Sequence, residues 1–132
     1  MKAYKFKIKR PSKAITNKFE NTLDCARELY NAGLQERRDA WKINRISITY
    51  QDQQNQLPDI RKSCTDVGQI YSQICQDVLK RLDKTFKSFF SRVKKSESKV
   101  GFPRFVRHSK LSARSGEWFY CSPERFRSFV PP

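Results

Sequence analysis

Residues 70–95, IYSQICQDVLKRLDKTFKSFFSRVKK, carry the clearest structural pattern in the chain. Apolar side chains recur there every three or four positions, which is the spacing of one face of an α-helix. These residues are Ile74, Val78, Leu82, Phe86, Phe89 and Val93. The opposite face carries Gln76, Lys80, Lys84, Lys87, Lys94 and Lys95. The pattern predicts an amphipathic helix with one core face and one cationic face.

The row of lysines on this helix has two interpretations. Single exposed lysines usually serve only solubility. Here five lysines lie together and Asp83 is the acid at the edge of the row. That excess favours a helix that lies along phosphates, because each neutralised phosphate releases counterions. Lys80, Lys84 and Lys87 are therefore candidate nucleic-acid ligands.

A second amphipathic helix is expected upstream, over residues 13–42, with Ser12 as its cap. Its apolar positions are Ile15, Phe19, Leu23, Ala26, Tyr30, Leu34 and Trp41. Gly33 is a candidate for a bend in this helix. Between the two helices, residues 51–63 contain few apolar side chains, so we expect a short helix or loop closed by Pro58.

Two short segments have the alternating pattern of β-strands. Tyr4, Phe6 and Ile8 alternate with Lys5, Lys7 and Lys9, which predicts a strand with one buried and one cationic face. A solvated lysine face would be the preferred interpretation if this row stood alone. It does not stand alone, so Lys5, Lys7 and Lys9 are candidate nucleic-acid ligands as well. Downstream, Gly101 and Pro103 break the helix, and the alternation of Val100, Phe102 and Phe105 indicates entry into another strand.

The charge of the chain is concentrated in two blocks. The 132 residues have a formal net charge of +15. Residues 1–18 contain seven Lys or Arg and no acid, and residues 80–110 contain eleven against two. Such density makes nucleic acid the leading partner and an anionic membrane surface the second. No apolar run is long enough for a membrane span and no signal core begins the chain, so we expect a soluble intracellular protein.

Catalysis and metal binding have little support in the sequence. The cysteines Cys25, Cys64, Cys75 and Cys121 form no CxxC pair, and His108 is the lone histidine. We therefore expect no metal and no disulfide, with Cys25 and Cys75 as small core residues. No nucleophile with its base, no phosphate-cradling glycine loop and no carboxylate cluster is evident. These features indicate a binding module without catalytic residues or cofactor.

Five ordered blocks make the chain, over about residues 1–105, similar to the N-terminal region of the OrfB/TnpB proteins of insertion sequences. The blocks are KAYKFKIKRPS at 2–12, ARELYNAGLQERRDAW at 26–41, SITYQDQQNQL at 47–57, QDVLKRLDKTFKSFF at 76–90 and KVGFPRF at 99–105. The resemblance implies an RNA-guided DNA endonuclease whose N-terminal part, also described as a helix-turn-helix domain, grips guide RNA and target DNA. We expect a bacterial or archaeal cytoplasmic protein associated with the nucleoid.

The fold that the resemblance implies is α+β and mostly helical. Residues 1–11 would be the first strand of a wedge-type β-barrel, 12–98 an inserted helical recognition region and 99–106 the return to the barrel, which remains incomplete. The family cleaves DNA with three carboxylates of a RuvC-type nuclease, usually beside a zinc ribbon, and none has a counterpart here. The first hypothesis is thus a truncated, catalytically inactive relative. A recognition half that pairs with a separately encoded nuclease half and a repressor of the element are the alternatives.

The family blocks add four candidate ligands to the lysines. Arg27 and Arg37 lie in the long-helix block, although Arg27 could equally pair with Asp24 or Glu28. Tyr50 and Gln76 are expected to read base edges while the lysines hold the backbone. For Tyr50, simple packing is an equal alternative.

Residues 107–132 continue no earlier pattern, as the stretch GEWFYCSPERF at 116–126 shows. Family members carry a segment similar to GFTVPQSGF after the GFPRF block. Codons for residues 118–126, read one nucleotide later, permit that segment, and the single tryptophan codon forces its first glycine. We hypothesise that this tail is an out-of-frame translation, irregular in structure. The nucleotide sequence beyond the stop codon tests the idea.

Overall fold

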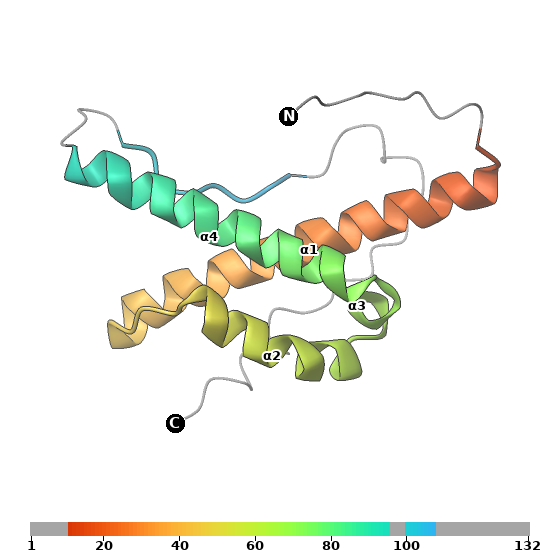
Figure 1. Ribbon diagram of the computed structural model, residues 1–132, viewed down its shortest axis with the longest axis horizontal. Coiled ribbons are helices and arrows are strands. Elements are labelled where there is room, and N and C mark those ends of the chain that lie inside the picture. The colour runs from red at the N-terminus through yellow and green to blue at the C-terminus, as the bar shows by residue number, and fades with distance from the viewer. Residues whose placement is uncertain (1–10, 96–99, 108–132) are drawn as a thin grey trace.

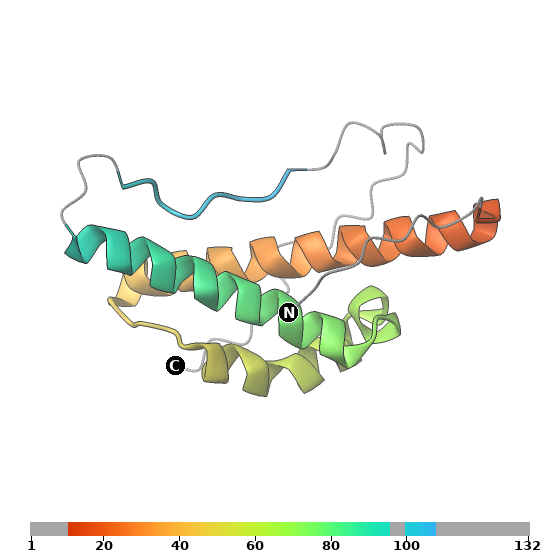
Figure 2. The same cartoon turned by 45° about the horizontal axis from the view of Figure 1, so that its top comes forward.

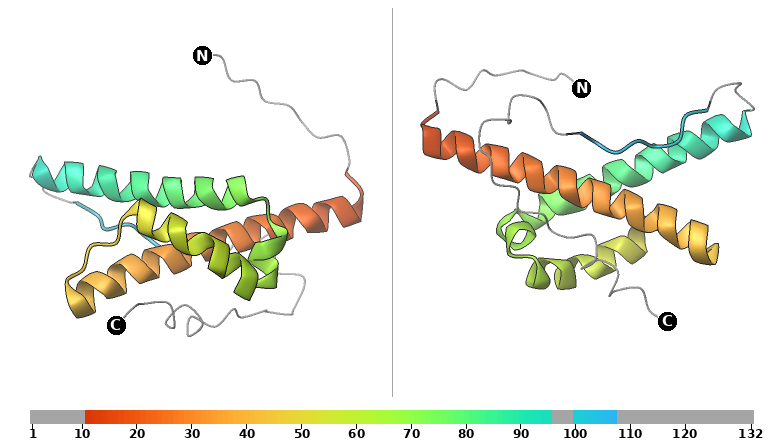
Figure 3. Two further views of the ribbon diagram at one scale, coloured as in Figure 1. Left: turned by 60° about the horizontal axis from the view of Figure 1, so that its bottom comes forward. Right: turned by 180° about the vertical axis from the view of Figure 1, so that it is seen from behind.

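The computed structural model describes residues 11–95 and 100–107, which are mostly helical (Figure 1). The helices are α1 (Lys13–Asn44), α2 (Tyr50–Ser63), α3 (Thr65–Gln69) and α4 (Ser72–Lys94). The two long helices α1 and α4 cross, and α2 and α3 lie to one side of the crossing (Figures 1 and 3). The predicted first strand, with Tyr4, Phe6 and Ile8, lies outside the described residues.

Helix α1 confirms the long helix predicted over residues 13–42. The hydroxyl of Ser12 accepts a hydrogen bond from the Ile15 N–H at 3.4 Å, which caps the first turn. The helix ends where Arg45 takes up the left-handed conformation, with φ 56° and ψ 25°. Gly33, a candidate for a bend, lies within this uninterrupted helix and is buried.

Helix α2 forms despite its low apolar content because its first turn is capped and one of its faces is buried. Thr49 and Asp52 make a reciprocal capping box, and hydrogen bonds from the Thr49 side chain and backbone hold the pKa of Asp52 below its ordinary value. The buried residues Gln53, Leu57 and Ile60 recur at helical spacing. The expectation that Pro58 closes this segment was wrong, since Pro58 lies inside the helix. The helix continues past it because Ile60 is anchored in the core.

The core has two neighbouring clusters at the helix crossing. The larger contains Leu29, Leu57, Ile60, Cys64, Val67, Ile70, Cys75 and Leu79, and the smaller contains Leu34, Leu82 and Phe86. On α4 the buried positions are Cys75, Leu79, Leu82 and Phe86, where α1 and α2 contact it. Ile74 is one position off this face and 40% exposed, and Val93, near the end of α4, is 48% exposed. Assigning these two to the core was therefore wrong.

Several apolar positions predicted for the core face of α1 are also exposed. Ile15, Phe19 and Leu23 in its first turns and Trp41 near its end lie largely in solvent. The reason is length, because α1 extends past the helices that pack against its middle (Figure 2). Leu34 of the predicted set is fully buried, together with Leu29, which the pattern did not select.

Residues 100–107 form no strand, so the strand entry predicted there is not supported, and the return to a β-barrel stays a prediction. The segment instead follows α4 and reaches α1 (Figure 1). The Phe102 ring packs edge-on against Phe86 and Phe89, with centroids 5.8 and 5.3 Å away. The side-chain amide of Asn31 exchanges two hydrogen bonds with the backbone of Val106, at 3.0 and 2.9 Å. Contacts with side chains thus replace the ladder that a neighbouring strand would supply.

Two thiols lie in or against the core, as expected for small apolar residues. Cys75 is 1% exposed, and Cys25 packs against the larger cluster while remaining half-buried. Burial raises the pKa of Cys25 to about 11, with the charge of Glu28 adding to it, and burial also raises that of Cys75. Both thiols are therefore protonated and unreactive at neutral pH.

Gly68 permits a close contact between α2 and α3. A Cβ added to Gly68 would lie 2.7 Å from the backbone oxygen of Arg61, which cannot move without shifting α2. Gly68→Ala is expected to lower the free energy of unfolding by about 1–2 kcal/mol, even though alanine favours a helix more than glycine does. Gly101→Ala is the control, because its Cβ would meet nothing within 4 Å. Equal urea midpoints for the two variants would contradict this packing.

No helix in the described ranges is both long and apolar enough to cross a membrane.

Candidate nucleic-acid interface

One face of α4 presents a row of lysines to solvent. Lys80, Lys84 and Lys87 are exposed, as the helical pattern predicted, and they lie opposite the buried face of α4. Lys80 and Lys84 have no acidic partner among the described residues. Their charges are therefore available to a polyanion.

Lys87 differs from the other two lysines because Asp83 partly neutralises it. Its ammonium nitrogen lies 2.8 Å from the Asp83 carboxylate, one helical turn away. Burial of Asp83 would raise its pKa, but hydrogen bonds from Lys87 and Arg37 outweigh that effect and lower the pKa. Asp83 is thus a carboxylate that links the exposed lysine row to the core.

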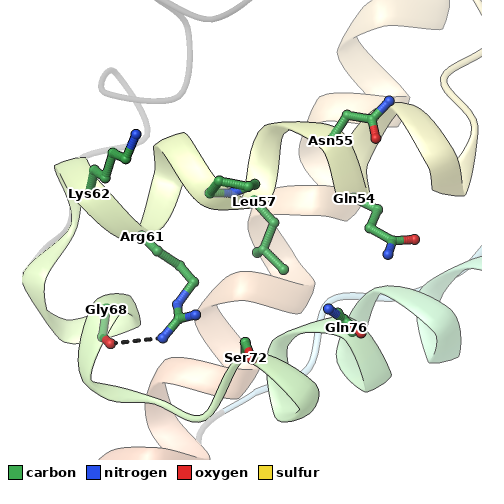
Figure 4. Close-up of a pocket in the computed structure, with 9 residues that line it drawn as sticks. Gln54, Asn55, Leu57, Arg61, Lys62, Gly68, Ser72 and Gln76 are labelled. Carbon is green, nitrogen blue, oxygen red and sulfur yellow. Dashed lines mark hydrogen bonds between the residues drawn. The ribbon is translucent and has the colours of Figure 1, made fainter.

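A hollow of about 590 Å³ opens beside this helix, between α2 and the start of α4 (Figure 4). It is lined by Gln54, Asn55, Leu57, Pro58, Arg61, Lys62, Gly68, Ser72 and Gln76. Gln54 extends from α2 toward α4, where Gln76 lies (Figure 4). Side-chain amides offer both donors and acceptors, which is the combination that base edges require.

Arg61 forms one end of the hollow and fixes the chain between α2 and α4. One guanidinium nitrogen donates to the carbonyls of Gly68 and Ile70, at 3.1 and 3.0 Å. Its Nε is buried and has no partner among the described atoms. Exposed Lys62 lies next to it on α2, so this end of the hollow is positively charged.

The amino-terminal end of α4 adds to that positive potential. Its first residue, Ser72, lines the hollow. Tyr71, which precedes it, gives no side-chain cap, and the first turn contains no acidic residue. The free N–H groups and the helix dipole therefore favour an anion at this end of the hollow.

Arg37, a predicted nucleic-acid ligand, lies in the core instead of on the surface. Only 8% of it is exposed, and its Nε donates to the Gln53 amide oxygen at 2.9 Å. Another of its nitrogens lies 3.3 Å from the Asp83 carboxylate, and its guanidinium carbon is 5.1 Å from the centroid of the Phe86 ring. In this position Arg37 joins α1, α2 and α4. A contact with phosphate would require that network to open.

The remaining predicted ligands are dispersed. Arg27 pairs with Asp24 at 3.0 Å, which is the structural role weighed against binding. Tyr50 is half-buried against the larger core cluster, so packing accounts for much of its surface. Gln76 lines the hollow. Lys5, Lys7 and Lys9 lie outside the described residues, as do His108 and Cys121.

The sequence pattern missed the buried amide that organises the helix crossing. Gln53 is 2% exposed, and its amide nitrogen donates to the Gly33 carbonyl at 3.0 Å and to Glu36 at 2.7 Å. A usable signal was present, because Tyr50, Gln53, Leu57 and Ile60 recur at the spacing of a helical face. The missed lining residues Gln54, Asn55 and Arg61 follow once that helix is recognised.

In the parts of the chain that the structure describes, no three His, Cys, Asp or Glu side chains gather as a metal ion would require.

Comparison with known families points to mobile elements. Residues 1–45, about a third of the chain, match the family model of the helix-turn-helix domain of OrfB proteins of the IS605 group. The match supports an N-terminal OrfB/TnpB-family helix-turn-helix region of a transposase, and such a domain suggests DNA binding. Within that range, α1 runs through residues 13–44 without a turn. A search of curated proteins returns no match.

Proposed function

We propose that this chain is the nucleic-acid-binding N-terminal part of a TnpB-like, RNA-guided DNA endonuclease, and that it binds guide RNA and target DNA. The observation that carries the proposal is the exposed lysine row of α4, in which Lys80 and Lys84 have no acidic partner among the described residues, beside an amide-lined, positively charged hollow. The family match at residues 1–45 supports DNA as a partner. The nuclease carboxylates of the family have no counterpart in the sequence, so the proposal includes no cleavage by this chain.

The lysine row of α4 and the hollow are expected to contact different parts of the nucleic acid. Lys80 and Lys84 are long, flexible point charges suited to phosphates, which fix position without reading sequence. Gln54 and Gln76 project from two different helices into one hollow, so a single base pair edge could contact both amides. Arg61, Lys62 and the start of α4 would neutralise the adjacent phosphate.

Two related functions remain as alternatives to a truncated relative. A separately encoded nuclease half would make the chain the recognition half of a split endonuclease, and the exposed apolar residues of α1, such as Phe19 and Leu23, favour some partner surface. A repressor of the element would need only the DNA-binding part. Adding candidate nuclease halves with Mg²⁺ and a guide distinguishes them, since only the split enzyme gains cleavage.

The direct test of the proposal is binding of the purified chain to labelled duplex DNA, single-stranded DNA and structured RNA. We expect binding to all three with modest sequence preference and affinity that falls steeply with salt. Fluorescence anisotropy at two salt concentrations measures it. Absence of binding, or binding that ignores salt, contradicts the proposal.

The hollow makes a prediction that concerns sequence preference. Gln54→Ala combined with Gln76→Ala is expected to reduce discrimination among randomised duplexes by about tenfold, since each lost pair of base contacts is worth about 1–3 kcal/mol. Average affinity for random DNA should change little. Selection from a randomised duplex library measures both. Gln51→Ala with Gln73→Ala is the matched control, because both amides are exposed and neither lines the hollow. Unchanged enrichment in the first variant would mean that the hollow reads no bases.

A further inference from the structure

The end of α1 exposes an aromatic side chain that the packing of the helices does not use. Trp41 is 54% exposed, and it belongs to neither core cluster. An exposed tryptophan is a candidate contact for a partner, because its large, partly polar ring is enriched at binding interfaces. The position also lies within residues 1–45, which match the family model.

Arg45 is held directly over this ring. Its guanidinium carbon lies 5.7 Å from the centroid of the Trp41 ring, a cation–π contact. The Arg45 N–H donates to the Trp41 carbonyl at 3.1 Å, and the Ile46 N–H donates to the Ala40 carbonyl at 3.2 Å. These bonds fix the left-handed conformation that turns the Arg45 side chain back along the helix.

Arginine is an uncommon choice for this conformation. Helices that end in a left-handed residue usually have glycine or asparagine there, because a Cβ is unfavourable at positive φ. Among the described residues, Arg45 is the one non-glycine residue with a positive φ. The backbone alone would favour glycine at this position. We therefore infer that arginine is present for the contact that its side chain makes with Trp41.

The charges around Trp41 indicate which partner fits the ring. Arg38, Lys42 and Arg45 are all exposed within one turn of it. The nearby acid, Asp39, accepts a hydrogen bond from the Gln35 amide at 2.8 Å and leaves a net positive surface. An apolar protein surface would not need this ring of cations, and in a duplex the base faces are already stacked. An unpaired base with flanking phosphates can stack on the Trp41 ring while its phosphates pair with the surrounding cations.

We propose that Trp41 and Arg45 form a stacking platform for an unpaired base of a single-stranded nucleic acid. The base stacks on the indole surface that Arg45 leaves open, while Arg38 and Lys42 contact the flanking phosphates. This inference rests on the proposed nucleic-acid binding and adds a preference for single strands at a site on α1.

The experiment uses the full chain with Trp118→Phe, which leaves Trp41 as the only tryptophan. Oligothymidylate of about twelve nucleotides is expected to quench the emission of Trp41, because a base stacks on the indole. Inorganic polyphosphate, which has charge without bases, should not quench it. Trp41→Ala should bind oligothymidylate about 10- to 100-fold more weakly at constant salt, and duplex DNA as the wild type does. Trp41→Phe should retain most of the affinity.

Arg45→Gly and Leu23→Ala complete the design. Glycine suits the left-handed helix end, so Arg45→Gly keeps α1 intact while single-strand affinity falls severalfold. Leu23, 68% exposed on the same helix, is the matched apolar control and should have no effect. Duplex binding with no quenching, and unchanged single-strand affinity of Trp41→Ala, would overturn the platform and leave the proposed function standing. Failure to bind any nucleic acid would overturn both.

Discussion

Replacement of Arg37 by methionine is expected to lower the free energy of unfolding by about 3 kcal/mol, because it removes one partner of a buried ion pair. The side chain of Arg37 joins three helices through Gln53, Asp83 and the ring of Phe86. Methionine keeps much of the apolar stem but leaves the Gln53 oxygen without its donor and a partly buried carboxylate without one of its cations. Urea denaturation followed by circular dichroism measures the loss.

Arg81→Met is the matched control for Arg37→Met. Arg81 also pairs with an aspartate, Asp77 at 2.7 Å, but both side chains are more than half exposed. Exposed pairs at this helical spacing contribute about 0.3–0.5 kcal/mol, so the control should remain near the wild type. If Arg37→Met were as stable as Arg81→Met, the buried network would not hold the helices together.

The same network predicts how stability changes in acid. The pKa of Asp83 is lowered in the folded chain, because hydrogen bonds from Lys87 and Arg37 outweigh the effect of burial. Its contribution is therefore present above the unfolded pKa and is lost as the pH falls through the lower folded value. Arg37→Met should show a shallower loss of stability in acid than the wild type does.

The second large effect concerns affinity for nucleic acid. Lys80→Ala combined with Lys84→Ala is expected to weaken binding to random-sequence DNA at least tenfold at low salt, because the variant removes two unpaired positive charges from the same exposed face of α4. Adding Lys87→Ala should weaken it less, since Asp83 already neutralises part of that charge. Electrophoretic mobility shifts on a labelled duplex measure the loss.

Helix content should survive these changes, because the lysines lie opposite the buried face of α4 and alanine favours a helix. Lys13→Ala with Lys18→Ala removes the same charge from an exposed part of α1 and serves as the control. An equal loss of affinity in the control would mean that net charge, and not the face of α4, determines binding.

The sequence predicted the existence of α1 and α4 because both have strong helical periodicity. It predicted their buried faces less well. Periodicity identifies a stripe of apolar residues but does not say how much of a helix its neighbours cover, so Ile15, Phe19 and Leu23 were assigned to a core that does not reach them. The exposure of Ile74 follows from where α1 and α2 contact α4, which is a tertiary property.

The candidate site was predictable where it depends on charge and less so where it depends on packing. Exposed Lys80 and Lys84 follow from helical geometry alone. The burial of Arg37 does not, since a long cation on an amphipathic helix can equally extend into water. The hollow can be predicted only once α2 is recognised as a helix, and the polar Gln53 on the buried face of α2 conceals its apolar spacing.

The most direct test of the account is the dependence of the DNA association constant on salt, measured for the wild type and for Lys80→Ala with Lys84→Ala. A plot of log K against log salt has a slope of about −0.9 for each neutralised phosphate. We predict a steep slope for the wild type and one shallower by about 2 in the variant, with the Lys13 and Lys18 control close to the wild type. A flat slope for the wild type, or an unchanged slope in the variant, would contradict binding through the basic face of α4.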